Sequence, residues 1–147
     1  MKVVIALGSN LGDREDLIQR AIDAVRELVT VERVSSLIET DPVGGPEQGK
    51  YLNGVLIGTT HLQPVELMEK LLEIESRLGR VRTVANAPRT IDLDLIDCDG
   101  LLLDTPTLQL PHPRAHLRPF VILPWLEIAP EGVLVGHGTL REIARGL

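Results

Sequence analysis

The sequence has few aromatic residues, a single cysteine and no long apolar run. These shortages limit, in turn, the stacking of rings, covalent or metal cross-links through cysteine, and a membrane-spanning segment. Its 147 residues include only three aromatics, Tyr51, Phe120 and Trp125, so very few side chains can stack on a ring-shaped ligand. Cys98 has no second cysteine with which to form an internal disulfide or a zinc cluster. No stretch reaches the roughly 18 apolar residues of a membrane span, and the apolar N-terminal run is too short for a signal peptide. We therefore expect a cytoplasmic protein without a membrane partner, built as one domain over residues 1–147.

The chain also lacks an excess of positive charge. Lys and Arg total 15 against 21 Asp and Glu, a formal net charge of -6, which argues against a surface that grips nucleic acid. Hydrophobic residues make up 44% and charged residues 24%, as in globular proteins that bury their own core. Neither the P-loop motif nor the Rossmann motif Gly-x-Gly-x-x-Gly occurs, so neither of these phosphate sites is expected.

Hydrophobic periodicity predicts six elements before the last third of the chain. Strands are expected at 2–8, 31–38, 51–60 and 91–96, and amphipathic helices at 14–29 and 64–78. Asp13 fits the N-cap of the first helix, Pro64 fits the first turn of the second, and Gly79 fits its end. The order β-α-β-β-α-β is typical of a ferredoxin-like antiparallel sheet with both helices on one face.

The last third of the chain predicts additions to that unit. We expect a hairpin at Asp99-Gly100, a short helix near 120–128 and a last helix from Thr139, which together would cover the other face of the sheet. The predicted fold class is therefore α+β: a ferredoxin-like βαββαβ antiparallel sheet in an α/β/α sandwich, with an extra C-terminal hairpin and helices.

Asp92-Leu93-Asp94 is the sharpest chemical signal. On a strand, residues i and i+2 point to the same face, so the two carboxylates converge while Ile91, Leu93 and Leu95 face a core. Two carboxylates on one face repel each other, and a divalent cation with oxygen ligands, such as Mg²⁺, offsets that repulsion. The alternative is a solvated polar face on an edge strand.

Arginines surround this acidic pair. Six of the twelve arginines lie between positions 77 and 118, where there is no lysine; they include Arg80, Arg82 and Arg89 before the pair and Arg114 and Arg118 after it. The guanidinium fork suits bidentate recognition of phosphate oxygens. Metal ligands among planar cations are typical of a site for a metal-bound nucleotide polyphosphate, although a solvated arginine-rich surface is the alternative.

Three further features are candidates for the same site. Glu75 falls inside the apolar face of the second helix, where a buried carboxylate needs a partner or a ligand, unless it lies at the edge of that face and reaches water. His112 lies beside the arginine cluster and could donate to a phosphate. The Gly8-Ser-Asn-Leu-Gly12 segment is a weak candidate for a phosphate-binding loop.

Several motifs together resemble those of one enzyme family. Ala87-Pro-Arg-Thr-Ile-Asp-Leu-Asp-Leu-Ile96 resembles the signature segment of the 6-hydroxymethyl-7,8-dihydropterin pyrophosphokinases of the folate pathway. Other family features occur in order over nearly the whole chain: Gly8-Ser-Asn-Leu-Gly12, Tyr51-Leu-Asn53, Gly79-Arg-Val-Arg82, Leu110-Pro-His112, Arg118-Pro-Phe120 and Leu126-Glu-Ile-Ala-Pro130. The fold of that family, a ferredoxin-like α+β sandwich, agrees with the order of elements above.

The resemblance implies a reaction and a set of site residues. The terminal pyrophosphoryl unit of ATP would pass to the hydroxymethyl oxygen of the pterin, with release of AMP. Asp92 and Asp94 would bind two Mg²⁺ ions. The other implied roles are ATP contacts for Glu75, Arg80, His112 and Arg118, a mobile catalytic loop carrying Arg82 and Arg89, and a pterin slot formed by Thr40, Val43, Tyr51, Asn53 and Phe120. Among the pterin contacts, Asn53 would read the polar edge, Phe120 would stack, and Thr40 and Val43 would use backbone groups.

The sequence departs from some family members at residues 83–87. Those members place an Arg and a Trp before the Gly-Pro-Arg, whereas this chain reads Thr83-Val-Ala-Asn-Ala87, so the loop is expected to close differently.

The acidic pair on a ferredoxin-like sheet leaves two other functions as alternatives to the pyrophosphokinase. A metal-dependent nucleotidyltransferase would also place an Asp pair on such a sheet, and a small-ligand regulatory domain would have little need of Asp92 and Asp94.

Overall fold

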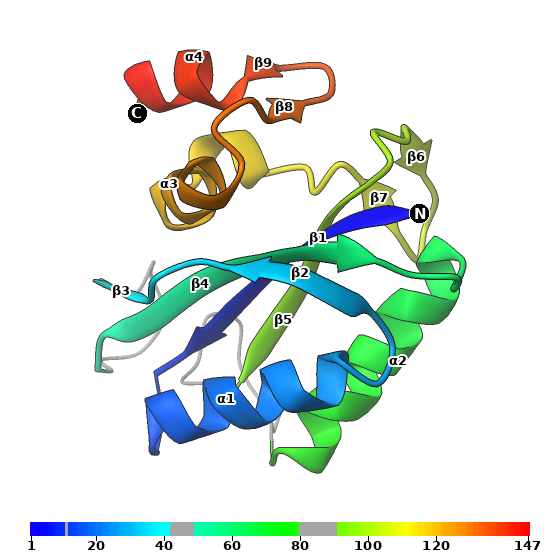
Figure 1. The fold of residues 1–147 in the computed structure, drawn as a ribbon, viewed down its shortest axis with the longest axis vertical. Helices are drawn as coiled ribbons and strands as arrows, with labels where there is room; N and C mark the ends of the chain where they lie inside the picture. The colour runs from blue at the N-terminus through cyan, green and yellow to red at the C-terminus, as the bar shows by residue number, and fades with distance from the viewer. Residues whose placement is uncertain (11, 42–48, 80–90) are drawn as a thin grey trace.

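The computed structural model describes residues 1–10, 12–41, 49–79 and 91–147 (Figure 1). Within these residues the chain forms a mixed α/β fold. Its principal elements are β1 (Lys2–Ser9), α1 (Arg14–Val25), β2 (Thr30–Val34), β3 (Ile38–Thr40), β4 (Tyr51–Thr59), α2 (Pro64–Arg77), β5 (Asp92–Cys98) and α3 (Pro119–Ile128). Shorter ones are β6 (Leu103–Asp104), β7 (Gln109–Leu110), the 3-10 helix η1 (Ala115–Leu117), β8 (Val133–Leu134), β9 (Gly138–Thr139) and α4 (Leu140–Arg145).

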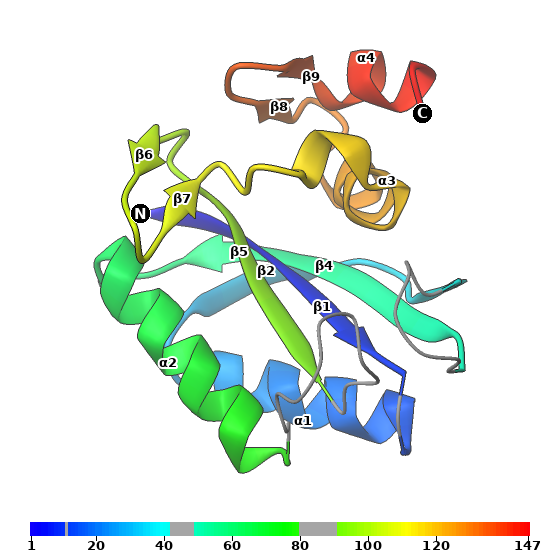
Figure 2. The same cartoon turned by 180° about the vertical axis from the view of Figure 1, so that it is seen from behind.

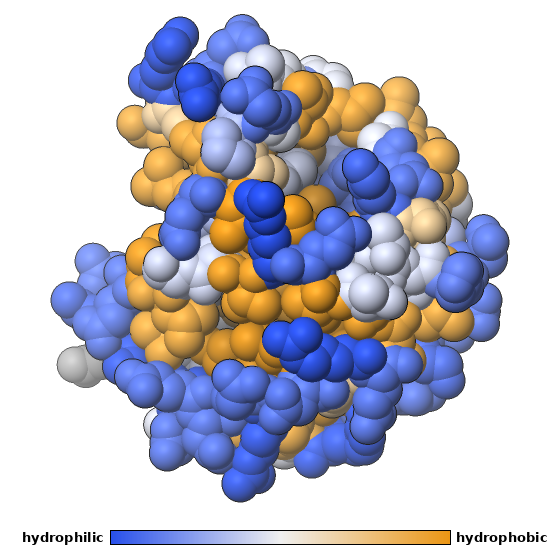
Figure 3. Space-filling model, viewed as in Figure 1, coloured by the Kyte–Doolittle hydropathy of each residue, from blue (hydrophilic) through white to orange (hydrophobic). Residues whose placement is uncertain are grey.

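One antiparallel sheet lies between two helical layers. Its strand order is β2-β4-β1-β5, with β3 also paired to β4, and every pairing between these strands is antiparallel. Figures 1 and 2 show α1 and α2 below the sheet and α3 and α4 above it. The outer side of α1 is hydrophilic in the space-filling view (Figure 3), as expected for a helix that buries only one face.

The two faces of the sheet each carry a hydrophobic core. Because β1 is covered on both sides, all its residues after Lys2 are buried. The first core packs Ile5, Leu7, Leu93 and further sheet residues against α1 and α2. The second core packs Val4, Ala6, Val55 and Ile96 against side chains from α3 and the C-terminal segment. Trp125 of α3, 4% exposed, belongs to this second core.

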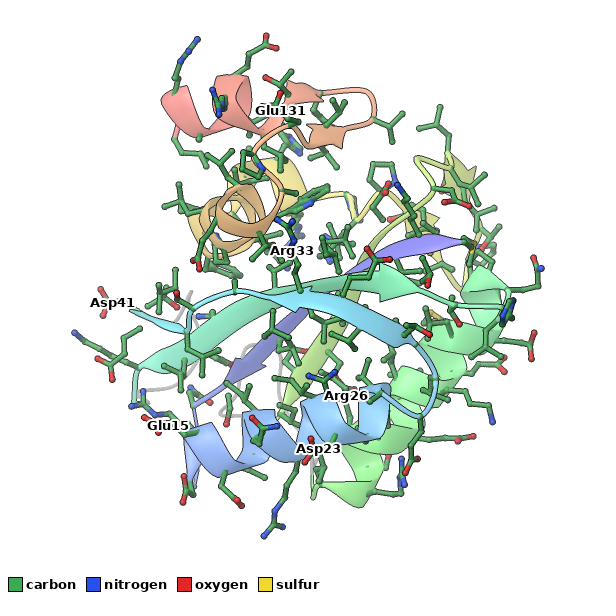
Figure 4. All side chains as sticks on the ribbon, in the orientation of Figure 1. Glu15, Asp23, Arg26, Arg33, Asp41 and Glu131 are labelled. Carbon is green, nitrogen blue, oxygen red and sulfur yellow. The ribbon has the colours of Figure 1, made fainter. Side chains whose placement is uncertain are left out.

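Side chains also tie α3 to the far edge of the sheet. Arg33 of β2 points toward α3, and its guanidinium donates to the Ile128 carbonyl at 3.2 Å, satisfying a group at the helix C-terminus (Figure 4). Ser36, after β2, donates through its backbone N–H and its hydroxyl to the Glu127 carboxylate at 3.0 and 2.8 Å. These bonds hold α3 over the face of β4.

The expected elements are present, with three differences. Asp13 caps α1 by accepting from Asp16 N, but the helix ends at Val25, earlier than position 29. The strand expected at 31–38 is split into β2 and β3, because the buried Ser35 hydroxyl accepts from Val55 N and donates to Ser36 O in place of a regular ladder.

The third difference concerns the hairpin. Asp99 and Gly100 form a turn with positive φ, but Asp99 bonds back to Lys2 of β1 through its backbone and side chain. The strands that pair after this turn are β6 and β7, so the hairpin lies over 103–110 and not at Asp99-Gly100.

Cys98 is a buried free thiol, and burial raises its pKa to about 12, so it is an inert core residue. In the part of the chain that the structure describes, no helix is both long and apolar enough to cross a bilayer.

Candidate active site

Asp92 and Asp94 lie at the start of β5, which forms one end of the sheet. They alternate with the buried Leu93 and Leu95, so the two half-buried carboxylates share the opposite face, as expected from the i, i+2 spacing. The Arg118 guanidinium, at the N-terminus of α3, lies 3.6 Å from Asp94 Oδ2. This cation offsets part of the repulsion between the two carboxylates.

A single row across three strands joins Asp92 to Asn53. In the sheet register, Gly8 of β1 stands opposite Asn53 of β4 on one side and opposite Asp92 of β5 on the other. Residues opposite each other share a face, and two strand spacings separate the outer pair by roughly 10 Å. The next row, Val55-Ala6-Asp94, lies beside it. The polar site therefore begins where the second core ends along β1.

Gly8 lets the Asn53 side chain lie close against β1. A Cβ atom at Gly8 would lie 2.9 Å from Asn53 Oδ1 and 3.6 Å from Tyr51 Cδ1. The first distance is closer than side-chain contacts allow, so only glycine fits without a shift. This corrects the interpretation of Gly8 as part of a phosphate-binding loop: it lies inside β1, which continues through Ser9.

Asn53, Thr40 and Tyr51 form one wall of the site. Asn53 is 6% exposed, and its Nδ2 donates to Thr40 Oγ1. Thr40 ends β3 and stands opposite Tyr51, the first residue of β4. The β3-β4 pair thus brings together the described residues expected to contact a pterin from this side.

Phe120 and Arg118 approach from α3. The Arg118 guanidinium carbon lies 5.6 Å from the centre of the Phe120 ring, within the range of a cation-π contact. The same guanidinium reaches Asp94. Arg118 therefore links the acidic pair to the one aromatic ring that α3 presents near the site, and Phe120 itself packs at the border of the second core.

Glu75 of α2 is buried, and its carboxylate holds the backbone of β5. The side chain is 2% exposed, and Oε2 accepts from Leu93 N at 2.8 Å. The expectation of a buried carboxylate that needs a partner is confirmed. Since Leu93 lies between Asp92 and Asp94, this bond fixes the backbone that carries both of them. The periodicity of the helix pointed to Glu75, but no sequence pattern could name Leu93 N as its partner.

His112 is held in its neutral form beside the acidic pair. Its backbone N–H donates to Ile96 O at 2.9 Å, and its Nδ1 accepts from Arg114 N at 3.2 Å. Burial and, to a lesser extent, the Arg118 charge together lower the pKa of the imidazole from 6.5 to about 4, while the Asp92 charge acts in the opposite direction. With Nδ1 accepting, the ring proton lies on Nε2, which can donate to an anion.

A hollow of about 730 Å³ adjoins the acidic pair along the outer edge of β5. Apolar side chains of α2 line one side, Leu93 to Leu95 form the floor, and the segment from Asp104 to Gln109 with His112 closes the other side. The sequence did not point to the 104–109 segment, because Asp104-Thr-Pro-Thr-Leu-Gln109 contains no motif and only one charged residue.

Some expected site residues cannot be placed. Arg80, Arg82, Arg89 and Val43, as well as the departure at 83–87, lie outside the described residues. Within the described ranges, no three His, Cys, Asp or Glu side chains gather as a metal site. Asp92 and Asp94 are candidate metal ligands because their two carboxylates share one face of β5.

Known proteins are similar to this chain over most of its length. Residues 4–130 match the family described as 7,8-dihydro-6-hydroxymethylpterin-pyrophosphokinase. The 2-amino-4-hydroxy-6-hydroxymethyldihydropteridine pyrophosphokinase of Bacillus subtilis is 44% identical over 129 residues, which cover 86% of this chain and 77% of the relative. The enzyme of the same name from Pseudomonas aeruginosa is 40% identical over 132 residues, covering 88% and 82%.

Solved structures share the fold. The crystal structure of wild-type Plasmodium falciparum HPPK-DHPS with pteroate aligns with 99% of this chain, at a TM-score of 0.77 and 14% identity. A second HPPK-DHPS structure, in complex with substrates, gives a TM-score of 0.71 at 12% identity. This chain spans 42% and 43% of those two chains, respectively.

Proposed function

The chain belongs to the 7,8-dihydro-6-hydroxymethylpterin-pyrophosphokinase family, and we propose that the row Asn53-Gly8-Asp92 is the centre of its active site. The enzyme transfers pyrophosphate from ATP to 6-hydroxymethyl-7,8-dihydropterin, giving AMP and the pterin diphosphate, in folate biosynthesis. The observation that best supports this proposal is the row itself, which places an amide that can hydrogen-bond the pterin and a carboxylate that can bind metal on one face, with only a glycine between them.

The hollow beside β5 is the proposed site of the adenosine part of ATP. Leu93 N donates outward to Glu75, and the antiparallel ladder repeats every second residue, so Leu95 also turns its N–H and C=O away from β1. The hollow therefore offers a donor and an acceptor at its floor, with the apolar side chains of α2 beside them. That combination suits the edge and face of a purine.

The triphosphate then extends from the hollow toward the acidic pair. Asp94 lines the hollow and neighbours Arg118, and His112 Nε2–H and the Arg118 guanidinium are donors suited to phosphate oxygens. A neutral His112 donates one hydrogen bond without adding charge. Arg80 and Glu75 are expected to contact ATP by resemblance, and for Glu75 we propose that the contact acts through Leu93 and the strand that carries Asp92 and Asp94.

The residues present fit Mg²⁺. Magnesium in nucleotide sites is held by one or two carboxylates together with phosphate oxygens and water, and Asp92 and Asp94 supply two half-buried carboxylates on one face. We expect two ions, held by both aspartates. When bound with ATP, Mg²⁺ neutralises the negative charge of the triphosphate.

The pterin occupies the opposite end of the row. Asn53 Nδ2 is engaged by Thr40, so Oδ1 accepts from an N–H of the pterin ring, while Tyr51 lines the slot and Phe120 stacks on the ring. This arrangement points the hydroxymethyl group along the row toward Asp92. An alcohol that attacks phosphorus needs in-line placement more than a strong base. In this proposal, the spacing between Asn53 at the pterin end of the row and Asp92 at the metal end provides that placement. Arg82 and Arg89 are expected to complete the site from their loop.

We also propose a specific topology for the sheet and its two helical layers. The strand order β2-β4-β1-β5, with α1 and α2 on one face, supports the expected ferredoxin-like βαββαβ arrangement. The chain is proposed to form one domain over residues 1–147, since both cores use the same sheet.

The decisive experiment incubates the protein with ATP, Mg²⁺ and 6-hydroxymethyl-7,8-dihydropterin and resolves the nucleotides. We expect AMP without free pyrophosphate, and the Asp94→Ala variant should form none. ADP as the sole nucleotide product would overturn the proposal. Free pyrophosphate with AMP attached to the acceptor would identify a nucleotidyltransferase. Ligand binding that is unaffected by Asp92→Ala and by removal of Mg²⁺ would identify a regulatory domain.

A further inference from the structure

Arg14, the first residue of α1, joins both strands of the β3-β4 pair. Its NH2 group donates to Glu39 Oε1 of β3 at 2.8 Å, and its NH1 group donates to the carbonyl oxygen of Lys50, just before β4, at 3.0 Å. One planar guanidinium thus contacts both chain segments at the Thr40-Tyr51 end of the pair, a geometry that a lysine ammonium does not reproduce. The Arg14 guanidinium also holds the pKa of the Glu39 carboxyl below its usual value.

The β3-β4 pair needs such a support. Strand β3 has three residues, and β4 is its partner in the sheet, so its ladder alone gives it few backbone bonds. Asn10 adds a second tie, because its buried side chain donates to Gly49 O at 3.2 Å. Figure 4 shows Glu15, next to Arg14, and Asp41, next to β3, on the same side of the molecule.

The partners of Arg14 adjoin the pterin wall directly. Glu39 precedes Thr40, which accepts the hydrogen bond from Asn53, and Lys50 precedes Tyr51. Thr40 and Tyr51 are also opposite each other in the β3-β4 register. Any loosening of the Arg14 bridge would therefore move the wall on which the pterin lies, while the hollow beside β5 is on the other side of β1.

We propose that Arg14 is a positioning residue for the pterin substrate. By bridging Glu39 and Lys50 it holds the β3-β4 pair to the start of α1, so that Thr40, Tyr51 and Asn53 keep the spacing that the pterin ring requires. This inference rests on the proposed function, since it takes the β3-β4 wall as the pterin side of the site.

A matched control lies on the same helix. Arg20 pairs with Asp16 at 2.9 Å, four residues away, and its side chain is 64% exposed. This ion pair stays within α1 and reaches no strand. Removal of Arg20 therefore deletes the same kind of side chain and the same charge without touching the pterin wall.

The experiment compares Arg14→Ala, Arg14→Lys and Arg20→Ala by steady-state kinetics with each substrate varied in turn. For Arg14→Ala we expect a KM for the pterin raised about three- to twentyfold, the range between an exposed ion pair and a charge-assisted hydrogen bond, and a KM for ATP within about twofold. The pterin KM of Arg14→Lys should lie between those of the wild type and Arg14→Ala, because lysine keeps the positive charge but lacks the planar guanidinium with its several N–H donors. Calorimetric titration of the pterin, with a non-hydrolysable ATP analogue present, should show the same order, and Arg20→Ala should match the wild type.

The possible failures are distinguishable. A wild-type pterin KM in Arg14→Ala, in a preparation whose wild type forms AMP, would overturn this inference alone. Equal rises in both KM values together with a lowered melting temperature would assign Arg14 a general structural role and also overturn it. A wild type that forms no AMP would overturn the proposed function, and this inference with it.

Discussion

Gly8→Ala adds one methyl group at the centre of the proposed site. The new Cβ would lie 2.9 Å from Asn53 Oδ1, so either the backbone of β1 or the Asn53 side chain must move. Gly8 lies between two paired strands, where its backbone is held by ladders on both sides. The Asn53 side chain is held through its Nδ2, which donates to Thr40 Oγ1, and its Oδ1 end can rotate away, so it is the group expected to shift.

The size of the effect follows from the cost of overpacking. An extra methyl group in a well-packed place costs about 1 to 3 kcal/mol. At about 1.4 kcal/mol for each factor of ten, the dissociation constant of the pterin should rise about 5- to 140-fold if the cost falls on Asn53. The affinity for ATP should change little, because the hollow beside β5 lies beyond Asp94.

Calorimetric titration of the pterin and thermal unfolding test this reasoning together. Gly49→Ala is the matched control, because a Cβ there would lie no closer than 3.8 Å to its nearest neighbour, Asn10 O, although Gly49 is also near the pterin wall. Pterin affinity of Gly8→Ala within twofold of the wild type would refute the claim that the Asn53 side chain needs a glycine beneath it to bind the pterin. A large fall in melting temperature with unchanged affinity would show that the backbone yields instead.

Three further predictions concern groups around the acidic pair. Glu75→Ala removes the acceptor for Leu93 N and should lower the free energy of unfolding, measured thermally, by about 1 to 3 kcal/mol. Glu75→Gln keeps an acceptor and should lower it less. Equal decreases in the two variants would contradict a stabilising role for this hydrogen bond. The pKa of His112 is lowered to about 4, so in the ligand-free enzyme its contribution to stability is complete above pH 6.5 and is lost as the pH falls toward 4. Between pH 6.5 and 4, the denaturant midpoint of His112→Gln should therefore fall less than that of the wild type. Asp94→Ala should leave the melting temperature nearly unchanged or raise it, because the repulsion with Asp92 is relieved and the partly exposed contact with Arg118 is weak; severe unfolding would show a structural role.

Local signals in the sequence were sufficient for much of the fold. The N-cap at Asp13, the proline that opens α2 and the glycine after it each act within one turn of chain, and the helices begin where these signals place them. The alternation in Asp92-Leu93-Asp94 likewise placed both carboxylates on one face, because the period of a strand is two residues.

Features that depend on distant contacts could not be predicted in this way. The break between β2 and β3 depends on Ser35 bonding to Val55, and the position of the hairpin depends on Asp99 bonding to Lys2. One partner of Glu75 is a backbone group, which no side-chain pattern reveals. In each case the deciding atom lies on another element.

The row Asn53-Gly8-Asp92 is the strongest case of this kind, because two separate ladders must agree to form it. A slip of one residue in either ladder would turn one side chain to the opposite face and empty the site. The burial of apolar side chains on both faces of the sheet prevents such a slip. Leu7 and Leu93 belong to the first core, and Ala6 and Val55 belong to the second. The two cores therefore set the register, and the register sets the distance between the pterin and metal ends of the site. Substitutions that weaken the cores without slipping the ladders should reduce stability and leave the substrate affinities of the folded protein unchanged.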